Sequence, residues 1–439
     1  MKPILKKLES EKIALIGLGS ENYALLRFLI KHKFKGALTV YDKASAKELG
    51  ARYKTLKKAK QITWRLGFPH YNEINNSSLI LRSPGVFVSP ALRKKLARAK
   101  IKISCPMQLF LELCPSNHTI GVTGTKGKGT TSSLIKAILE KGGKKAWLGG
   151  NIGIAPFEFI EKIKKKDWVI LELSSFQLED ILQSPHIAVF TNFSPEHLAA
   201  ADPHNDNYHV SLQKYWQAKL NIFAFQKKND IAIINQSIRR PLPALASKII
   251  RFASSDLPSQ LQGEHNKENI AAAVAVAQNI GINAKAISAG ILSFKGLPYR
   301  LEKITVKNGV TYYNDSLAGN PSGAMTALKA FSTPVILLAG GADKGARFNA
   351  LAKLALKKTK AIVLLSGDAT PKLKTALIKA GYNKKNIRLV HNMPQAIAAA
   401  RAFAKPGDTI LLSPACASFG LFKNYKDRGD QFNDCVRKG

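Results

Sequence analysis

The chain has 439 residues, of which 45% are hydrophobic and 22% are charged, so it is long enough for several folded domains. No stretch approaches the ~18 apolar residues of a membrane helix, and the first residues lack the apolar core of a signal peptide, which predicts a cytoplasmic protein. The formal net charge is +38. The basic residues are scattered in pairs and triplets, so we expect a solvated basic surface without a specific nucleic-acid partner. Four cysteines without a C-x-x-C motif predict reduced thiols.

The first predicted domain, residues 1–114, begins with the pattern of a nucleotide-binding βαβ unit. A strand runs into the turn G-L-G-S, which contains Gly19 and Ser20, and the following strand ends at Asp42, where a carboxylate can reach a ribose or base hydroxyl. A later strand ends in the turn Ser83-Pro84-Gly85. Because strand ends in an open α/β sheet face the ligand crevice, these residues are candidate substrate contacts. The third glycine of the dinucleotide motif is missing, which leaves a tight turn without a ligand as the alternative.

The second predicted domain, residues 115–297, holds the most informative motif. The segment G-V-T-G-T-K-G-K-G-T-T (Gly121 to Thr131) lies between an apolar strand pattern and an amphipathic helix pattern, which predicts a phosphate-binding loop. Its glycines let backbone amides face a polyanion, and Lys128 supplies a positive charge for the outer phosphates. Because Gly129 follows this lysine, Thr130 is the expected hydroxyl ligand of Mg²⁺. The alternative is a glycine-rich turn that only precedes a helix.

Two further strands of this domain end in polar residues. The segment W-V-I-L-E ends at Glu172. A carboxylate in a buried parallel strand is costly unless it is paired or bound to a metal, which favours a Mg²⁺ ligand over an incidental charge. The segment I-A-V-F-T-N-F-S-P-E-H places His197 at the mouth of the next strand, where a ligand role and a structural role are about equally favoured.

Later in the domain, Lys219 lies on an otherwise apolar predicted helix, and Asn266 and Asn269 open another helix. For both asparagines, helix capping and ligand contact are equal alternatives.

In the third predicted domain, residues 298–439, the strands end in Gly, Ser, Asp or Lys. Asp315 ends one of them and Lys344 ends another, and a third runs into S-P-A-C-A-S-F. This pattern predicts a doubly wound sheet whose polar C-terminal edge faces a cleft. The predicted fold class is therefore α/β with three domains: a Rossmann-like domain, a central P-loop ATPase domain and a second Rossmann-like domain.

Taken together, these segments resemble the Mur ligase family in the family's order over nearly the whole chain. The matching segments are G-V-T-G-T-K-G-K-G-T-T, G-G-N-I-G, L-E-L-S-S-F-Q-L-E, G-E-H-N-K-E-N, L-P-Y-R-L-E, N-D-S-L-A-G-N-P, L-L-S-P-A-C-A-S-F and F-K-N-Y-K-D-R-G-D-Q-F. The resemblance implies that the three domains bind a UDP-linked substrate, ATP and an amino acid. It implies a monomer that phosphorylates the carboxylate of UDP-N-acetylmuramoyl-L-alanine with ATP and joins it to D-glutamate, in peptidoglycan precursor synthesis.

The resemblance also implies the roles of individual residues. Catalytic roles fall on Lys128, His197 and Lys219. One Mg²⁺ would be bound by Thr130 and Glu172, and a second by His197 and a carbamylated Lys219. ATP contacts are implied for Gly124, Thr125, Lys126, Gly127, Lys128, Gly129, Thr130, Thr131, Asn266, Asn269, Arg300 and Asp315. Substrate contacts are implied for Gly19, Ser20, Asp42, Ser83, Pro84, Gly85, Asn151, Lys344, Ser418 and Tyr425.

The segment from His197 to Lys219 is longer than in the family, and Ala199 stands where the family has aspartate. Two residues of the amino-acid pocket also depart from the family pattern. Leu317 and Gly319 stand where the family has lysine and threonine in the amino-acid pocket, and losing a cation there weakens carboxylate binding. A ligase for a different amino acid is therefore an alternative. Two others are a folate-type polyglutamylating enzyme and a basic nucleotide- or nucleic-acid-binding protein without catalysis.

Overall fold

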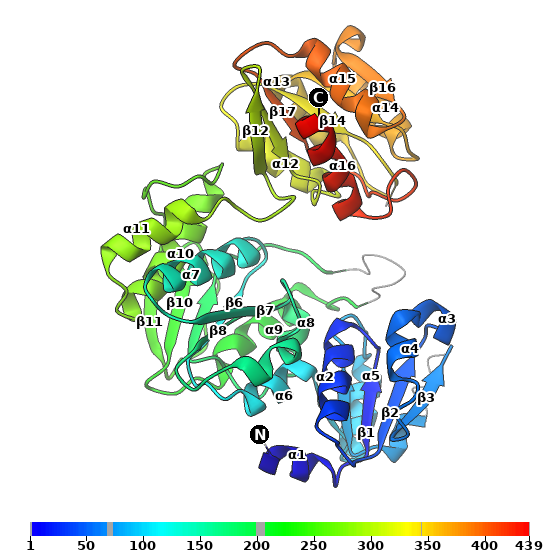
Figure 1. Cartoon of the computed structure of the whole chain (residues 1–439), viewed down its shortest axis with the longest axis vertical. Helices are drawn as coiled ribbons and strands as arrows, with labels where there is room; N and C mark the ends of the chain where they lie inside the picture. Colours follow the sequence, from blue (N-terminus) through cyan, green and yellow to red (C-terminus); the bar gives the residue numbers. More distant parts are fainter. Residues whose placement is uncertain (1, 68–72, 199–206, 344, 439) are drawn as a thin grey trace. The chain divides into compact units, whose positions relative to one another are not determined.

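The computed structural model describes residues 2–67, 73–198, 207–343 and 345–438 (Figure 1). The chain forms two compact units, one of Met1–Leu257 with Glu268–Ile291 and one of Pro258–Lys267 with Leu292–Gly439. In the described ranges, no helix is long and apolar enough to cross a membrane.

The first unit begins with a five-stranded parallel sheet in the order β3-β2-β1-β4-β5. Its strands are β1 (Ile13–Ile16), β2 (Leu38–Asp42), β3 (Ile62–Leu66), β4 (Leu79–Arg82) and β5 (Lys102–Ser104). Its helices are α1 (Lys2–Leu8), α2 (Ser20–Lys31), α3 (Ala46–Leu49), α4 (Ala51–Leu56), η1 (Glu73–Asn76), α5 (Pro90–Arg98) and α6 (Pro106–Leu113). The strand order reverses between β1 and β4, so the turns that follow these two strands lie side by side.

A second parallel sheet in the same unit has six strands in the order β11-β10-β9-β6-β8-β7. The strands are β6 (Thr119–Thr123), β7 (Ala146–Gly150), β8 (Trp168–Glu172), β9 (Ile187–Phe190), β10 (Ile231–Asn235) and β11 (Lys248–Phe252). The helices are α7 (Lys128–Lys141), η2 (Pro156–Glu158), η3 (Ile160–Lys162), α8 (Ser175–Leu178), α9 (Leu212–Ala224), α10 (His265–Asn279) and α11 (Ala284–Ser293). Because β6 lies between β8 and β9, the loops after these three strands meet at one edge.

The second unit contains a six-stranded sheet in the order β12-β13-β17-β14-β15-β16, in which only the β12–β13 pair is antiparallel. Its strands are β12 (Glu302–Lys307), β13 (Val310–Asn314), β14 (Val335–Ala339), β15 (Thr359–Leu365), β16 (Ile387–Val390) and β17 (Thr409–Leu412). Its helices are α12 (Pro321–Lys329), α13 (Asn349–Lys358), α14 (Thr370–Lys379), η4 (Lys384–Asn386), α15 (Met393–Phe403) and α16 (Tyr425–Lys438).

The buried apolar residues explain why the first two sheets form one unit. A single core cluster includes Leu25 and Phe28 of α2, Phe110 of α6 and Phe157 of η2. The ring centroids of Phe28 and Phe157 are 5.2 Å apart, and those of Phe110 and Phe157 are 5.9 Å apart. Aromatic contacts of this kind add to the apolar area that the cluster removes from water. The sheets of the first unit therefore share a hydrophobic core.

The prediction of an α/β chain with parallel sheets is confirmed, and the three predicted domain boundaries stay predictions. One placement is wrong: β9 ends at Phe190, so His197 lies in the loop beyond the strand and not at its mouth. Asn266 lies inside α10, which begins at His265, and its side-chain amide donates to the carbonyl of Gln262 at 2.7 Å.

A buried carboxyl group also joins the first two sheets. Glu21 lies in the first turn of α2, is 7% exposed, and accepts a hydrogen bond from Nε2 of Gln177 in α8. Its second oxygen has no hydrogen-bond partner among the residues that the structure describes. Burial raises the pKa of Glu21 to about 7, although the Gln177 hydrogen bond and the charge of Arg82 act in the opposite direction.

We expect Glu21→Gln to stabilise the protein more at pH 8 than at pH 5. The pKa of Glu21 rises from 4.5 to about 7 on folding, so ionisation favours the unfolded chain increasingly as pH rises through this window. At about 1.4 kcal/mol per pKa unit, the gain from the substitution grows by about 2 to 3 kcal/mol between these pH values. Urea unfolding at pH 5 and pH 8 measures this difference.

Asp167→Asn is the matched control. Burial acts to raise the pKa of Asp167, but hydrogen bonds from Trp147 and from the Lys164 amide lower it overall, so this group stays ionised across the window. Its substitution should have the same effect at both pH values. An equal effect of Glu21→Gln at pH 5 and pH 8 would contradict the account of Glu21.

Candidate active site

The glycine loop connects β6 to α7, as the sequence predicts. Gly124 has φ 146° and Gly127 has φ 82°, conformations that side chains rarely adopt. A Cβ atom at Gly124 would lie 2.0 Å from Oγ1 of Thr191, and one at Gly127 would lie 2.2 Å from Oδ1 of Asn269. Neither position has space for a side chain. The loop therefore requires glycine at both positions as it leads into the N-terminus of α7, which is the arrangement that binds phosphate.

Lys128 is the first residue of α7, and its amino group donates to the carbonyl oxygens of Gly124 and Thr125, both at 3.0 Å. The positive charge thus lies against the loop. The buried Thr131 hydroxyl donates to Oδ1 of Asn269 at 3.2 Å, which ties the loop to α10. This bond leaves Thr130 as the better candidate for a metal ligand.

Glu172 lies at the end of β8, beside the end of β6. Its side chain is buried, and Oε1 accepts a hydrogen bond from Nδ2 of Asn151 at 2.8 Å. The backbone amide of Asn151 also donates to the carbonyl of Glu172, at 2.9 Å. The two predicted site residues, Asn151 and Glu172, are therefore held together by two hydrogen bonds next to the glycine loop.

Lys219 of α9 is 1% exposed, and its amino group donates to the carbonyl of Gly124 at 2.7 Å. Burial lowers the pKa of Lys219 well below its usual range, and the charge of Lys128 lowers it further. Glu196 and Glu172 act in the opposite direction. A lowered pKa increases the fraction of the amine that is uncharged and nucleophilic.

His197 adopts a positive φ of 59°, which is uncommon outside glycine. Burial lowers its pKa to about 4; the charge of Glu196 raises it, and those of Lys219 and Lys128 lower it further. The imidazole is therefore neutral at physiological pH, which is the form that binds metals. The backbone amide of His209 donates to the carbonyl of His197 at 2.8 Å and helps to fix the loop.

These side chains fit a divalent cation beside the loop. Thr130 offers a hydroxyl oxygen and Glu172 a buried carboxylate, which are ligands that Mg²⁺ prefers. Among the described residues, no three His, Cys, Asp or Glu side chains gather into a ready-made metal site. A cation here would therefore depend on the hydroxyl and on oxygen atoms from the substrates. A second cation between His197 and Lys219 would require the lysine to gain a carboxylate.

Sequence reasoning missed three residues of this site. The hydroxyl of Tyr215 hydrogen-bonds with that of Thr125 at 3.1 Å, and Oδ1 of Asn192 accepts from the Lys126 amide at 2.8 Å. Glu196 pairs with the amino group of Lys126. Tyr215 lies one helical turn before Lys219, and its ring is 4.8 Å from that amino group, so helical spacing could have identified it. Asn192 and Glu196 lie between β9 and His197, in a segment whose sequence has no regular pattern that would identify them.

The turns after β1 and β4 of the first sheet come together. A Cβ atom at Gly19 would lie 2.5 Å from Oγ of Ser83, so the turns after β1 and β4 are in contact. The carboxylate of Asp42 accepts from the backbone amides of Leu18 at 2.6 Å and Ala44 at 2.8 Å. Asp42 therefore stabilises this turn, whatever ligand the crevice binds.

In the second unit, Asp315 and Ser413 follow the neighbouring strands β13 and β17. The Ser413 hydroxyl donates to the Asp315 carboxyl at 2.7 Å, and burial raises the pKa of Asp315 to about 7. Arg428 of α16 is buried and donates to Ser316 Oγ at 3.0 Å and to the carbonyl of Cys416 at 3.1 Å. Sequence reasoning did not assign a role to Arg428, which joins the two loops.

The other predicted residues of this unit lie nearby in the chain. Ser418 is buried after β17, Tyr425 begins α16, Arg300 is exposed, and Leu317 is 37% exposed in the loop after β13. Lys344 lies outside the described residues. Predicted ATP contacts thus fall in both units, with Asn269 beside the glycine loop and Arg300 and Asp315 in the second unit.

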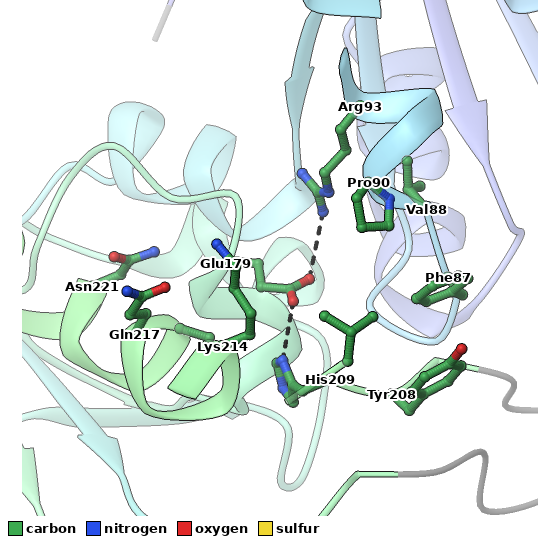
Figure 2. Close-up of a pocket in the computed structure, with 12 residues that line it drawn as sticks. Phe87, Val88, Pro90, Arg93, Glu179, Tyr208, His209, Lys214, Gln217 and Asn221 are labelled. Atoms are coloured by element: carbon green, nitrogen blue, oxygen red, sulfur yellow. Dashed lines mark hydrogen bonds and ion pairs between the residues drawn. The ribbon is translucent and has the colours of Figure 1, made fainter. Parts of the chain in front are cut away.

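A pocket of about 400 Å³ lies beside this site in the first unit (Figure 2). Its lining includes Arg93, Glu179, His209 and Lys214, and an aromatic pair, Phe87 and Tyr208, whose ring centroids are 4.7 Å apart. His209 binds Glu179 at 3.2 Å. The pocket therefore adjoins the loop of His197 through His209.

A parallel sheet that carries a glycine loop, an adjacent lysine and a buried carboxylate defines an α/β enzyme that uses a nucleoside triphosphate. Two family models match the chain: the Mur ligase middle domain over residues 122–253 and the Mur ligase glutamate ligase domain over residues 299–416. The chain belongs to the Mur ligase family.

Relatives of this chain can be aligned with it over almost its full length. The UDP-N-acetylmuramoylalanine--D-glutamate ligase of Symbiobacterium thermophilum is 35% identical, over 97% of this chain and 98% of that protein. The enzyme of the same name from Clostridium perfringens is 35% identical, over 98% and 97%.

Among solved structures, the UDP-N-acetylmuramate-alanine ligase MurC of Thermotoga maritima has a TM-score of 0.58 at 16% identity, over 98% of this chain and 99% of that one. The ADP complex of MurF ligase from the same organism has a TM-score of 0.58 at 15% identity, over 99% and 97%. These structures show the shared fold.

We expect Gly127→Ala to weaken ADP binding by at least about tenfold. The new Cβ would collide with Asn269 Oδ1, and alanine is strained at φ 82°, so the loop must move away from its phosphate-binding shape. Isothermal titration with ADP measures the affinity. Gly143→Ala is the control, because Gly143 has φ 72° but no atom within 4 Å of the added Cβ. If both variants bound ADP as the unchanged protein does, the loop would not be the nucleotide site.

Proposed function

We propose that this chain joins the carboxyl group of UDP-N-acetylmuramoyl-L-alanine to the amine of D-glutamate, with cleavage of ATP to ADP and phosphate. The main support for this proposal is that Lys128, Glu172 and Lys219 all lie around the glycine loop. The two relatives with 35% identity, both named as D-glutamate ligases, support this choice of substrates.

In the first step, an oxygen of the acceptor carboxylate attacks the γ-phosphorus of ATP, which forms an acyl phosphate and releases ADP. The loop amides and Lys128 hold the phosphates and offset the negative charge that spreads over the transferred group. Thr130 and Glu172 would hold Mg²⁺, which supplies further positive charge to the phosphate oxygens when it is bound. Asn151 fixes the orientation of Glu172.

In the second step, the amine of D-glutamate attacks the acyl carbon, phosphate leaves and the amine loses a proton. The buried Lys219 amine, whose pKa is lowered, is suited to adding CO₂, which would convert it into a carbamate with two oxygen atoms. That carboxylate and the neutral imidazole of His197 would then hold a second cation. Lys219 thus contributes to positioning the reacting groups and not to the attack itself.

We assign the UDP portion of the acceptor to the crevice that contains Gly19, Ser20, Asp42 and the turn after β4. The support is the contact between the turns after β1 and β4, at the point where the strand order reverses. We assign D-glutamate to the loops of the second unit that carry Ser418 and Tyr425, and to Lys344.

Phosphate release from ATP tests the proposed function. We expect release only when UDP-N-acetylmuramoyl-L-alanine and D-glutamate are both present, with one phosphate for each amide formed. Phosphate release that does not depend on the muramoyl substrate, or no phosphate release at all, would contradict the proposal. A panel of other amino acids tests the alternative raised by Leu317 and Gly319: release with another amino acid and not with D-glutamate would assign a different specificity to this pocket.

We expect Lys219→Ala to lower the ligation rate at least about 100-fold, because it removes the group that would carry the second cation. A small carboxylic acid such as acetate should restore part of the rate, since the truncated side chain leaves space for it beside Gly124. Arg240→Ala, which removes a cation that lies over the Trp216 ring of the same helix, serves as the control and should keep its rate. Full activity of Lys219→Ala would remove Lys219 from the mechanism.

A further inference from the structure

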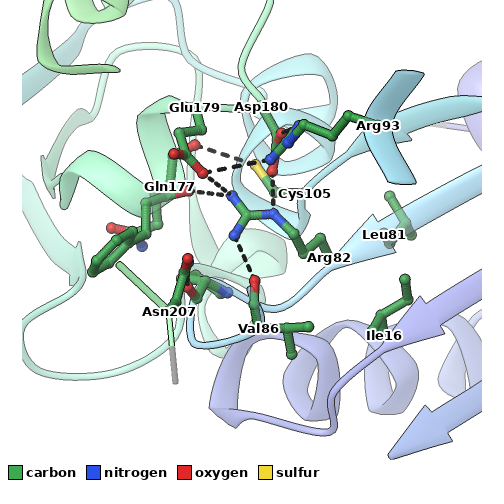
Figure 3. A network of polar contacts seen from close by, with 12 residues as sticks. Ile16, Leu81, Arg82, Val86, Arg93, Cys105, Gln177, Glu179, Asp180 and Asn207 are labelled. Carbon is green, nitrogen blue, oxygen red and sulfur yellow. Dashed lines mark hydrogen bonds and ion pairs between the residues drawn. The ribbon is translucent and has the colours of Figure 1, made fainter. Parts of the chain in front are cut away.

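The largest fully buried side chain in the first unit is a charged one. Arg82 ends β4 and is 1% exposed (Figure 3). Its Nε donates to Oδ2 of Asp180 at 2.5 Å, and its Nη2 donates to Oε2 of Glu179 at 2.9 Å and to the carbonyl of Phe176 at 2.7 Å. Its Nη1 donates to the carbonyl of Val86 at 2.9 Å. One guanidinium group therefore makes four hydrogen bonds in the interior.

The partners of Arg82 belong to two different segments. Val86 lies in the chain's own turn after β4, which contains the Ser83-Pro84-Gly85 sequence. Phe176, Glu179 and Asp180 lie in the segment of α8, which begins three residues after Glu172. Arg82 thus connects the turn after β4 in the first sheet to the chain segment that follows Glu172, the candidate metal ligand in the second sheet.

The charges of this group are balanced. Arg93 of α5 also contacts Asp180 at 2.8 Å and Glu179 at 3.4 Å, so two cations face two carboxylates. Burial alone would lower the pKa of Arg82, but Asp180 and Glu179 raise it overall, so the guanidinium stays charged. A balanced group of buried charges with four hydrogen bonds to the guanidinium permits few alternative arrangements, because breaking one contact leaves a charge unpaired.

We propose that Arg82 is a positioning residue for ligation: it fixes the turn Ser83–Gly85 relative to the α8 segment, so that an acceptor carboxylate held by the first sheet meets the phosphoryl group at the glycine loop. This inference rests on the proposed function. It assigns Arg82 no contact with substrate, and it makes the geometry between the two sheets a determinant of the rate.

Surface ion pairs between the same parts of the chain provide a matched comparison. Arg27 of α2 pairs with Glu158 of η2 at 3.1 Å, and these side chains are 49% and 34% exposed. Exposed pairs of this kind contribute little to rigidity because water screens them. Arg27→Gln therefore removes a cation from the same boundary without disturbing the buried group.

The experiment compares Arg82→Lys, Arg82→Gln, Asp180→Asn and Arg27→Gln by steady-state ligation kinetics and by ADP titration. We expect Arg82→Gln and Asp180→Asn to lower kcat/KM for the muramoyl substrate about 10- to 100-fold, with the ADP affinity within about twofold of the unchanged protein. Arg82→Lys keeps the charge but cannot make all four bonds, so its kcat/KM should lie between those of Arg82→Gln and the unchanged protein. Arg27→Gln should change neither quantity.

The separation between substrate kinetics and ADP affinity distinguishes positioning from general damage. If Arg82→Gln fails to fold, Asp180→Asn and Arg82→Lys still carry the test. Equal losses in ADP affinity and in ligation, or unchanged kinetics in both of these variants, would overturn the proposal. Failure of the proposed function is recognised separately, because the unchanged protein would then show no ligation to compare.

Discussion

The site is organised around a buried amine that contacts the glycine loop. Lys219 donates to the carbonyl of Gly124, the same atom to which Lys128 donates. Burial lowers the pKa of Lys219, and the nearby charge of Lys128 lowers it further. We propose that Lys128 supplies positive charge to the phosphates and that Lys219, with its lowered pKa, adds CO₂. The chemistry that we propose depends on this division of roles.

The parallel sheets place the other groups around that point. β6 lies between β8 and β9, so Glu172 and the segment leading to His197 both emerge beside the loop. The first sheet is attached to this edge by buried polar contacts, from Arg82 to the α8 segment and from Gln177 to Glu21. These contacts are costly to bury singly, but together with the shared apolar core they hold the turns after β1 and β4 beside the α8 segment.

Much of this could be predicted from the sequence, because local patterns determine strand ends. The glycine loop, the position of Glu172 at the end of β8 and that of Lys219 within α9 follow from apolar runs bounded by glycine and polar residues. His197 was misplaced because the polar segment after Phe190 has no regular period, so the pattern could not show where the strand stops. The Arg82 contacts could not be predicted, since a pairing across 98 positions of sequence leaves no local signal. The roles of Asn266, Arg300, Ser418 and Tyr425 remain predictions that came from the family resemblance alone.

The central claim is that this site activates a carboxylate by phosphorylation before the amide forms. The most direct measurement uses UDP-N-acetylmuramoyl-L-alanine labelled with ¹⁸O in its carboxylate, with mass analysis of the phosphate released during ligation. Our account predicts that each phosphate carries one labelled oxygen, because the acceptor oxygen leaves with the phosphoryl group. Phosphate without label, formed together with the amide product, would contradict an acyl phosphate and with it the role that we give to the glycine loop.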